Sequence, residues 1–233
     1  SCLRDNALAS ALRRRGHDVV IVPLYLPMVL EHAGVEAEAI RMGGINLYLE
    51  HRLKWFRRVP RGMTRFLDNP ALLRISSRLG DMTDAHKLGA ITLSMLLGDD
   101  GPIAKEVEDL ALSLLDIGRP DVVLLSNVML IGVARRLKQV LGCSVACTLQ
   151  GEAPFLDALD EPFRAAAWRI VRERLDHVDR LLPVSEWYGE LMADRLAVDA
   201  TRMTAVWNGI EVDGLAPGPR ESGPPVIGFL SRM

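Results

Sequence analysis

The chain is short of the residues and motifs that identify several common classes of protein. Its 233 residues include three cysteines, Cys2, Cys143 and Cys147, and no pair with Cys-x-x-Cys spacing. An odd number without that spacing argues against a disulfide framework and against a zinc site. No apolar run reaches the roughly 20 residues that span a bilayer. The formal net charge is −2, which gives no overall field that would attract nucleic acid.

Several motifs of known chemistry are also absent. The sequence has no Walker A phosphate loop, no Gly-x-Gly-x-x-Gly turn and no Gly-x-Ser-x-Gly elbow. The missing elbow argues against an α/β-hydrolase. The five histidines show no spacing typical of metal ligands, so we expect no metal and no cofactor. The free cysteines fit a reducing cytoplasm best, and peripheral contact with the inner face of the membrane is a further expectation.

What the sequence does contain is enough apolar residues for a sizeable core. Hydrophobic residues make up 49% of the chain and charged residues 25%, the composition of a soluble globular protein. Apolar residues at helical spacing predict a helix over residues 2–15, with Gly16 as its end. The β-branched run Asp18–Tyr25 predicts a strand buried on both faces. A helix followed by a buried strand matches the second half of a βαβ unit, so we expect the first strand of that unit before Ser1.

Strand and helix patterns alternate again after residue 102. We expect strands at Val122–Leu125, Ser144–Leu149 and Arg180–Val184, and a short further strand at Met203–Val206. The helices expected between and around them are Ile103–Ile117, Leu130–Leu141, Pro162–Leu175 and one that begins after Ser185. This alternation predicts an α/β fold with a Rossmann-like parallel sheet and helices on both faces.

A helical segment at about residues 46–100 interrupts this alternation. Residues at helical spacing predict helices from Asn46, over Pro70–Leu79 and over Asp84–Leu97. The segment is too long for one crossover, so we interpret it as an insertion that covers one side of the sheet. The expected division of the chain is a Rossmann-like domain at 1–212, a linker at 213–224 and the first strand of a second domain at 225–233.

Each expected strand ends in polar or small residues, where ligands of such sheets bind. The sequences at these ends are Pro23–Leu26, Ser126-Asn127, Gln150-Gly151-Glu152, Ser185-Glu186 and Trp207-Asn208-Gly209. Strands commonly end in polar loops, so each one taken singly is more often ordinary than functional. The strongest candidate is Gln150-Gly151-Glu152, because it combines an amide, a glycine and a carboxylate at the end of a central strand.

Six short motifs follow one another along the chain. They are LxxxGHDVxxxxLY near the start, then PDVVLLSN, TLQGE, VSEW, AVWNGIEVDGLAP and IGFLSRM. In this order and spacing they resemble glycosyltransferase family 4, the retaining, nucleotide-sugar-dependent enzymes of GT-B fold. The likeness covers nearly the whole chain. It implies a hexosyltransferase-like enzyme that moves a sugar from a nucleotide-sugar donor to a saccharide, lipid or other hydroxyl acceptor, with the oligomeric state left open.

The resemblance also implies which half of the enzyme this is. In such enzymes the N-terminal half binds the acceptor and the C-terminal half holds most of the donor, so we expect an acceptor half, truncated at both ends and inactive as a fragment. The implied substrate-binding residues are Gly43, Gly44, Asn46, Asn127, Gly151, Ser185, Asn208 and Gly209. Arg232 stands where family members have an arginine that contacts the donor diphosphate.

One position departs from the family. After the strand that corresponds to Ser144–Leu149, many members place a histidine that touches the donor sugar, whereas this chain has Gln150. Glutamine can hydrogen-bond a hydroxyl but cannot titrate. The resemblance therefore implies that Gln150 and Glu152 are the catalytic residues, which face the sugar and act by positioning and charge stabilisation. The diphosphate leaving group can itself accept the proton of the acceptor hydroxyl.

Two other interpretations remain open. A nucleotide-sugar epimerase also uses Rossmann-like halves, but it would bring acidic and histidine residues to the donor, and only Glu152 is a candidate. A non-catalytic module could instead bind a partner through Trp55, Phe56 and Phe66 of the helical segment. We favour packing of these aromatic residues against the sheet, and the folding of a Trp55 variant would distinguish the two.

Overall fold

A parallel sheet organises the part of the chain that the computed structural model describes, residues 2–22, 24 and 85–209. Its strands β1 (Val122–Leu125), β2 (Ser144–Leu149) and β3 (Arg180–Pro183) lie side by side in that order. The register places Val122 beside Ser144, and Ala146 beside Arg180. The predicted α/β fold with a parallel sheet is confirmed, and β1 and β2 have the predicted bounds.

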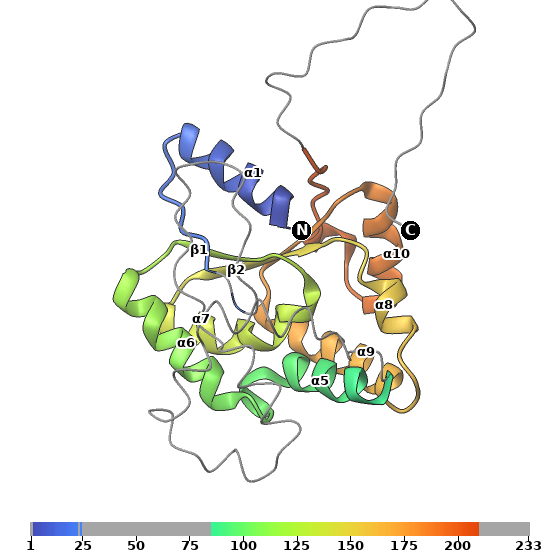
Figure 1. The fold of residues 1–233 in the computed structure, drawn as a ribbon. Coiled ribbons are helices and arrows are strands. Elements are labelled where there is room, and N and C mark those ends of the chain that lie inside the picture. Colours follow the sequence, from blue (N-terminus) through green and yellow to red (C-terminus); the bar gives the residue numbers. More distant parts are fainter. Residues whose placement is uncertain (1, 23, 25–84, 210–233) are drawn as a thin grey trace, which may run out of the picture.

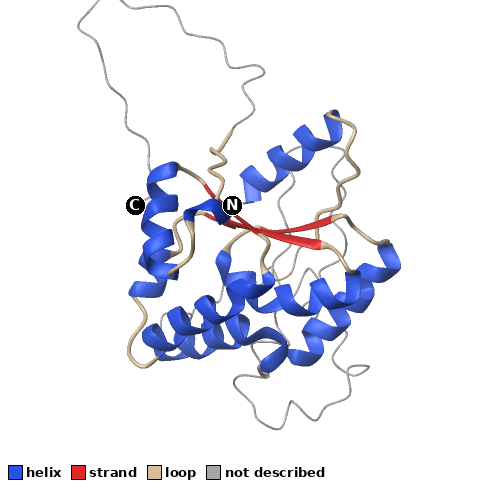
Figure 2. Ribbon diagram, turned by 180° about the vertical axis from the view of Figure 1, so that it is seen from behind, coloured by secondary structure: helices blue, strands red, loops and turns tan. Residues whose placement is uncertain are grey.

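Helices lie on both faces of this sheet, as predicted (Figures 1 and 2). One face carries α1 (Cys2–Arg14), and the other carries α5 (Ala85–Leu97), α6 (Ala104–Ile117), α7 (Ala134–Leu141) and α9 (Phe163–Arg174). The carboxyl ends of β2 and β3 lead into α8 (Ala153–Asp157) and α10 (Glu186–Leu196). Short 3-10 turns complete the described chain: η3 (Gly98–Asp100), η4 (Val128–Val133), η5 (Leu175–His177) and η6 (Ala200–Arg202).

The central strand β2 carries the middle of the core. Val145, Cys147, Thr148 and Leu149 are all 0% exposed, so both faces of the strand are covered. This burial is typical of a strand inside a parallel sheet with helical layers. The free thiol of Cys147 behaves here as an apolar group, and its burial raises the pKa of the thiol well above its ordinary value.

The segment after α10 returns to the outer edge of β3. Met203 pairs with Leu181 in a parallel bridge. The amides of Thr204 and Val206 donate to the carbonyl oxygens of Leu181 and Pro183 over 3.0 and 2.8 Å. The predicted short strand Met203–Val206 thus pairs with the sheet as expected, although only its first residue forms a bridge. Its pairing brings Trp207 to the same edge of the sheet as the end of β3.

The predicted strand Asp18–Tyr25 is wrong for the residues that the structure describes. Strand-like pairing there is confined to Ile21, and Val20 is 45% exposed. One reason is that the Arg13 guanidinium donates to the Val19 carbonyl oxygen over 2.9 Å and so occupies a group that a strand ladder would use. A second is that β1 has no strand on its outer edge among the described residues.

The helix predicted at Leu130–Leu141 begins differently. Residues Val128–Val133 form the 3-10 turn η4, and only Ala134–Leu141 is α-helical. The backbone of Gly132 lies so close to α5 that a Cβ atom there would sit 2.1 Å from the Met95 carbonyl oxygen. This close contact fixes the path of the turn before the regular helix starts. The helix α8 was not predicted at all.

Parts of the predicted architecture lie outside the described residues. They are the helical segment up to residue 84, the linker at 213–224 and the strand at 225–233. Of the predicted insertion, only its last helix can be compared. That helix is confirmed as α5 (Ala85–Leu97).

Candidate functional site

A small open pocket lies at the carboxyl ends of β1 and β2. Its volume is about 230 Å³, and its lining residues are Asn127, Met129, Gln150, Gly151, Glu152 and Phe155. Complete small-molecule sites usually measure about 300–1,000 Å³. The described residues therefore form one wall of a site rather than an enclosed one. The position matches the rule that ligands of parallel α/β sheets bind at the carboxyl ends of the strands.

Asn127 is fixed by the start of the turn that follows β1. Its side-chain Oδ1 accepts a hydrogen bond of 3.0 Å from the amide of Met129, which caps η4. Because a backbone amide can only donate, this contact identifies the oxygen of the Asn127 amide. Within the described part of the chain, no residue accepts a hydrogen bond from the Asn127 Nδ2 group. The pocket therefore has a fixed donor at this edge.

Gln150 is held in the opposite sense, through the nitrogen of its side-chain amide rather than through the oxygen. Its Nε2 group donates to the Ser126 carbonyl oxygen and, over 3.1 Å, to the Thr148 hydroxyl. The Thr148 hydroxyl in turn donates to the Ser126 carbonyl oxygen over 2.5 Å. With the nitrogen used in this way, no described residue hydrogen-bonds the Gln150 Oε1 atom. The pocket therefore gains a fixed acceptor beside the Asn127 donor.

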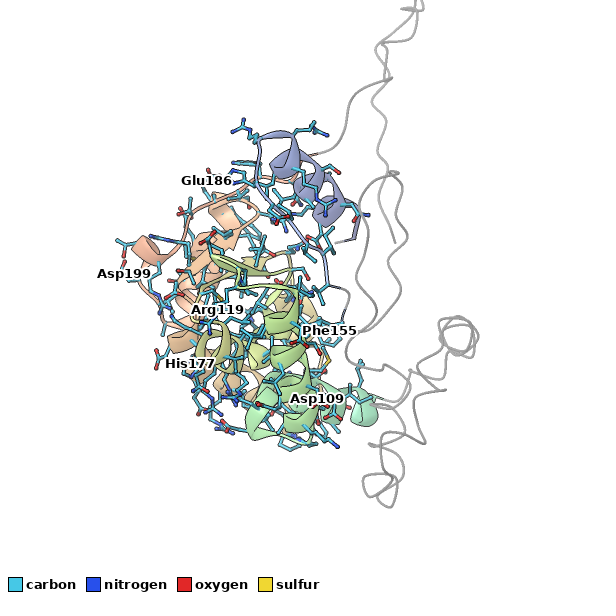
Figure 3. All side chains as sticks on the ribbon, turned by 90° about the vertical axis from the view of Figure 1, so that its left-hand side faces the viewer. Asp109, Arg119, Phe155, His177, Glu186 and Asp199 are labelled. Atoms are coloured by element: carbon cyan, nitrogen blue, oxygen red, sulfur yellow. The ribbon has the colours of Figure 1, made fainter. Side chains whose placement is uncertain are left out.

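Gly151 leaves the pocket open between these polar groups and α8. Its φ of +97° lies in the region that favours glycine, and nothing lies within 4 Å of where its Cβ would be. Phe155 on α8 and Met129 on η4 add an apolar surface. Phe155 is 38% exposed and lies on one side of the described body, whereas Glu186 and Asp199 lie on the other (Figure 3).

Glu152 lines the pocket but directs its carboxylate into the protein. The side chain is 8% exposed. Its Oε1 accepts the amide of Val128 over 3.2 Å, and its Oε2 accepts the amide of Gln150 over 2.7 Å. Tyr188 on α10 donates its hydroxyl to the same Oε2 over 3.3 Å. This buried carboxylate is stabilised by neutral donors alone, since none of its hydrogen-bond partners is a cation.

Tyr188 connects α10 to the same group. Its hydroxyl accepts the amide of Ala153 over 3.2 Å while donating to Glu152. The ring is 6% exposed. Burial raises the pKa of Tyr188, and the negative charge of Glu152 raises it further. The phenol therefore stays protonated at neutral pH and remains a hydrogen-bond donor.

The predicted site residues divide into three groups. Asn127, Gln150, Gly151 and Glu152 come together in the pocket. Ser185 instead caps α10 by accepting the Tyr188 amide over 3.2 Å, and Asn208 and Gly209 are exposed residues that do not line the pocket. The positions of Gly43, Gly44, Asn46 and Arg232 lie outside the described residues.

Sequence reasoning missed four residues of the site: Thr148, Met129, Phe155 and Tyr188. Thr148 could have been found, because it lies two residues before Gln150 on the same strand and residues two apart face the same side. Phe155 and Met129 belong to α8 and η4, whose short turns gave no periodic signal. Tyr188 lies 36 residues from Glu152, so no local pattern joins the two.

Neither a metal centre nor a membrane helix is present in residues 2–22 and 85–209. No group of histidine, cysteine and acidic side chains there could hold a metal ion. None of the helices in this part combines the length and apolar character that a membrane crossing requires.

Comparison with known proteins adds one finding. A family model described as Glycosyl transferase 4-like domain matches residues 6–209. This span takes in the whole sheet and every residue that lines the pocket. No curated protein matches the chain.

Proposed function

We propose, because the chain belongs to the glycosyl transferase 4-like domain family, that its domain is the acceptor-side half of a retaining glycosyltransferase. Such an enzyme moves a sugar from a nucleotide-sugar donor to a hydroxyl of an acceptor. The family supports sugar donor and acceptor substrates in general. The retaining course, the nucleotide-sugar and the assignment of this half to the acceptor are our proposal.

The paired amides of the pocket carry this proposal. Asn127 offers a fixed donor and Gln150 a fixed acceptor, and their contacts with Met129 and Ser126 prevent the two amides from exchanging these roles. A saccharide hydroxyl both donates and accepts, so it is suited to bridge such a pair. Phe155 supplies an apolar surface for the ring carbons, as small-molecule sites usually do.

The proposed chemistry is positioning rather than acid–base catalysis by the protein. Gln150 does not titrate, and the Glu152 carboxylate already accepts hydrogen bonds from Val128, Gln150 and Tyr188. The donor diphosphate then takes the proton of the acceptor hydroxyl as the sugar is transferred. The domain contributes a fixed orientation of the reacting hydroxyl. No metal or cofactor is required, and a cytoplasmic supply of nucleotide sugar fits this role.

The remaining residues belong to the same proposal. Gly43, Gly44 and Asn46 would contact the acceptor, Ser185, Asn208 and Gly209 would shape the interdomain floor, and Arg232 would contact the donor diphosphate. An epimerase fits the pocket less well, because it needs exposed acid and base groups. Among the described lining residues the only ionisable group is Glu152, and it faces inward.

Binding without turnover tests the proposal. Residues 1–233 are incubated with radiolabelled nucleotide sugars and a panel of saccharide acceptors. We expect saccharide binding, and neither transfer nor hydrolysis of the donor. Sugar transfer or donor hydrolysis by this chain would contradict its assignment as the acceptor half. Absence of binding to every saccharide tested would contradict the pocket assignment.

A further inference from the structure

Four segments of the chain meet at one buried carboxylate beside the pocket. Glu152 accepts the amide of Val128 at the start of η4 and the amide of Gln150 at the end of β2, over 3.2 and 2.7 Å. Tyr188 of α10 donates to it over 3.3 Å and also accepts the amide of Ala153 at the start of α8, over 3.2 Å. We call Glu152, Tyr188 and the three amides the carboxylate knot.

The two pocket amides belong to residues that this knot holds. Gln150 is held directly through its own backbone amide. Asn127 is the residue before Val128, whose amide the same carboxylate binds. The direction of the Asn127 and Gln150 side chains therefore depends on a carboxylate that forms a hydrogen bond with neither side-chain amide.

The knot also sets the apolar side of the pocket. Tyr188 holds the first residue of α8, and Phe155 lies two residues further along this helix. A helix of one turn has little stability of its own. The contact from α10 therefore fixes where Phe155 stands relative to the two amides.

The charge of Glu152 suits this task better than a reaction. Three donors converge on the carboxylate, and a hydrogen bond to a charged group is about twice as strong as a neutral one. The group is 8% exposed, and both of its oxygens are already used by donors from the protein. A general base would need a free lone pair directed at the substrate.

We propose that Glu152 and Tyr188 are positioning residues, which orient the Asn127 and Gln150 amides and Phe155 without contacting the substrate. This inference rests on the proposed saccharide function. It assigns Tyr188, on a helix outside the pocket, a role in that function. It also moves Glu152 from a residue expected to face the sugar to one that acts through its neighbours.

The first test compares Tyr188→Phe with Asp199→Ala by nuclear magnetic resonance of the 233-residue chain. Tyr188→Phe keeps the ring and removes only the hydroxyl. Asp199→Ala is the matched control, because it removes one cap, accepted from the Thr201 amide over 2.8 Å, on the other side of the body (Figure 3). In Tyr188→Phe we expect amide exchange at Ala153 and Gln150 to accelerate by about tenfold. The control should change only around Thr201.

A second readout separates positioning from mere stabilisation. The side-chain NH2 signals of Asn127 and Gln150 should shift or broaden in folded Tyr188→Phe and stay unchanged in folded Asp199→Ala. If Tyr188→Phe leaves these signals and the exchange rates unchanged, the proposal is overturned. No sugar is needed for this result, so a failure to bind saccharides would count against the proposed function and not against the knot.

The third test measures coupling between the two residues. Exchange at Gln150 is recorded in Tyr188→Phe, in Glu152→Gln and in the double variant. Because Tyr188 acts through the carboxylate, its effect should fall from about tenfold to less than about twofold in the Glu152→Gln background. Equal effects in both backgrounds would overturn the proposal. Should Glu152→Gln fail to fold, the NH2 signals in Tyr188→Phe decide the matter alone.

Discussion

Two polar clusters in this domain, each built around one buried ionisable side chain, use opposite principles. In the helical layer, Arg174 is bound by Asp99 and Asp100 over 2.7 Å each, and Arg135 binds the same two carboxylates. Beside the pocket, Glu152 is bound only by amides and a phenol. The first cluster pairs every charge with an opposite one. The second keeps a buried charge without a cation.

This difference indicates that the first cluster stabilises the fold and that the second orients the pocket. The cluster around Arg174 joins η3, α7 and α9, and its side chains are occupied by one another. The carboxylate knot lies beside a pocket. In that pocket the Asn127 Nδ2 donor and the Gln150 Oε1 acceptor are left to bind a ligand. We therefore expect damage to the first cluster to lower stability, and damage to the second to change the pocket as well.

The largest expected effect is the loss of stability when the cluster around Arg174 is broken. Arg174→Met should lower the free energy of unfolding by about 3–4 kcal/mol, because it removes the buried guanidinium that pairs with Asp99 and donates to the Leu97 carbonyl oxygen. Asp99 then keeps Arg135 alone as a partner. Urea denaturation measures this loss. The control Arg169→Met breaks an exposed pair with Glu173 and should cost less than about 0.5 kcal/mol. Similar losses in both would contradict the structural role of the buried cluster.

The second largest effect is expected when the Glu152 carboxylate is replaced by an amide. Glu152→Gln should lower the free energy of unfolding by about 2–3 kcal/mol, because an amide NH2 then faces one of the backbone donors. Saccharide binding should be lost at the same time, which distinguishes this variant from Arg174→Met. Calorimetry on the folded fraction measures binding. A folded Glu152→Gln chain that binds saccharide as tightly as the original would contradict the account.

A smaller effect is expected where only the ligand contact is removed. Gln150→Ala should weaken saccharide binding by about tenfold, since it removes the acceptor that the pocket offers to a hydroxyl. The free energy of unfolding should change by about 1 kcal/mol or less. Val140→Ala, a similar truncation on α7 away from the pocket, serves as the control and should leave binding unchanged. Comparing the two variants separates the loss of the amide from a general loosening of the domain.

The smallest effects are those of pH, and they fall on different sides of neutrality. Burial and the charge of Glu152 raise the pKa of Tyr188, so the stability from its protonated phenol is complete below about pH 10 and is lost as the pH rises through the folded-state pKa. Ultraviolet titration of tyrosinate, with Tyr188→Phe subtracted, measures this. A Tyr188 that ionises at the ordinary pKa would contradict its buried contact with Glu152.

His177, beside the Arg174 cluster, is expected to lower the stability of the domain as the pH falls. Burial, with the charges of Arg135 and Arg174, lowers the pKa of His177. The stability from its neutral ring is therefore present above about pH 6.5 and is lost as the pH falls through the folded-state pKa. Urea unfolding of the chain and of His177→Gln across this range measures the difference. An unchanged difference between pH 7 and pH 5 would contradict the effect.

The sequence was sufficient where the signal was local. The runs that became β1 and β2 are bounded by turn residues, so their limits could be predicted to the residue. The same local signal placed Gln150, Gly151 and Glu152 at the end of the central strand. It failed for Asp18–Tyr25, because burial of that run depends on neighbouring strands that a local pattern cannot supply.

The function of Glu152 could not be predicted in the same way. Its partners Val128 and Tyr188 lie 24 and 36 residues away along the chain. The fold alone brings them to one carboxylate. The orientation of Asn127 and Gln150 likewise follows from backbone groups of Met129 and Ser126, which carry no sequence signal.

The central claim is that the Asn127–Gln150 amide pair binds a saccharide. The most direct measurement is a titration of the 15N-labelled chain with neutral saccharides, observed at the side-chain NH2 signals of these two residues and at the amide of Gly151. We expect these signals to move together with one shared dissociation constant, and the backbone amide signals of Asp199 and Thr201 to stay in place. Saccharide binding that moves other residues and leaves these three unchanged would contradict it.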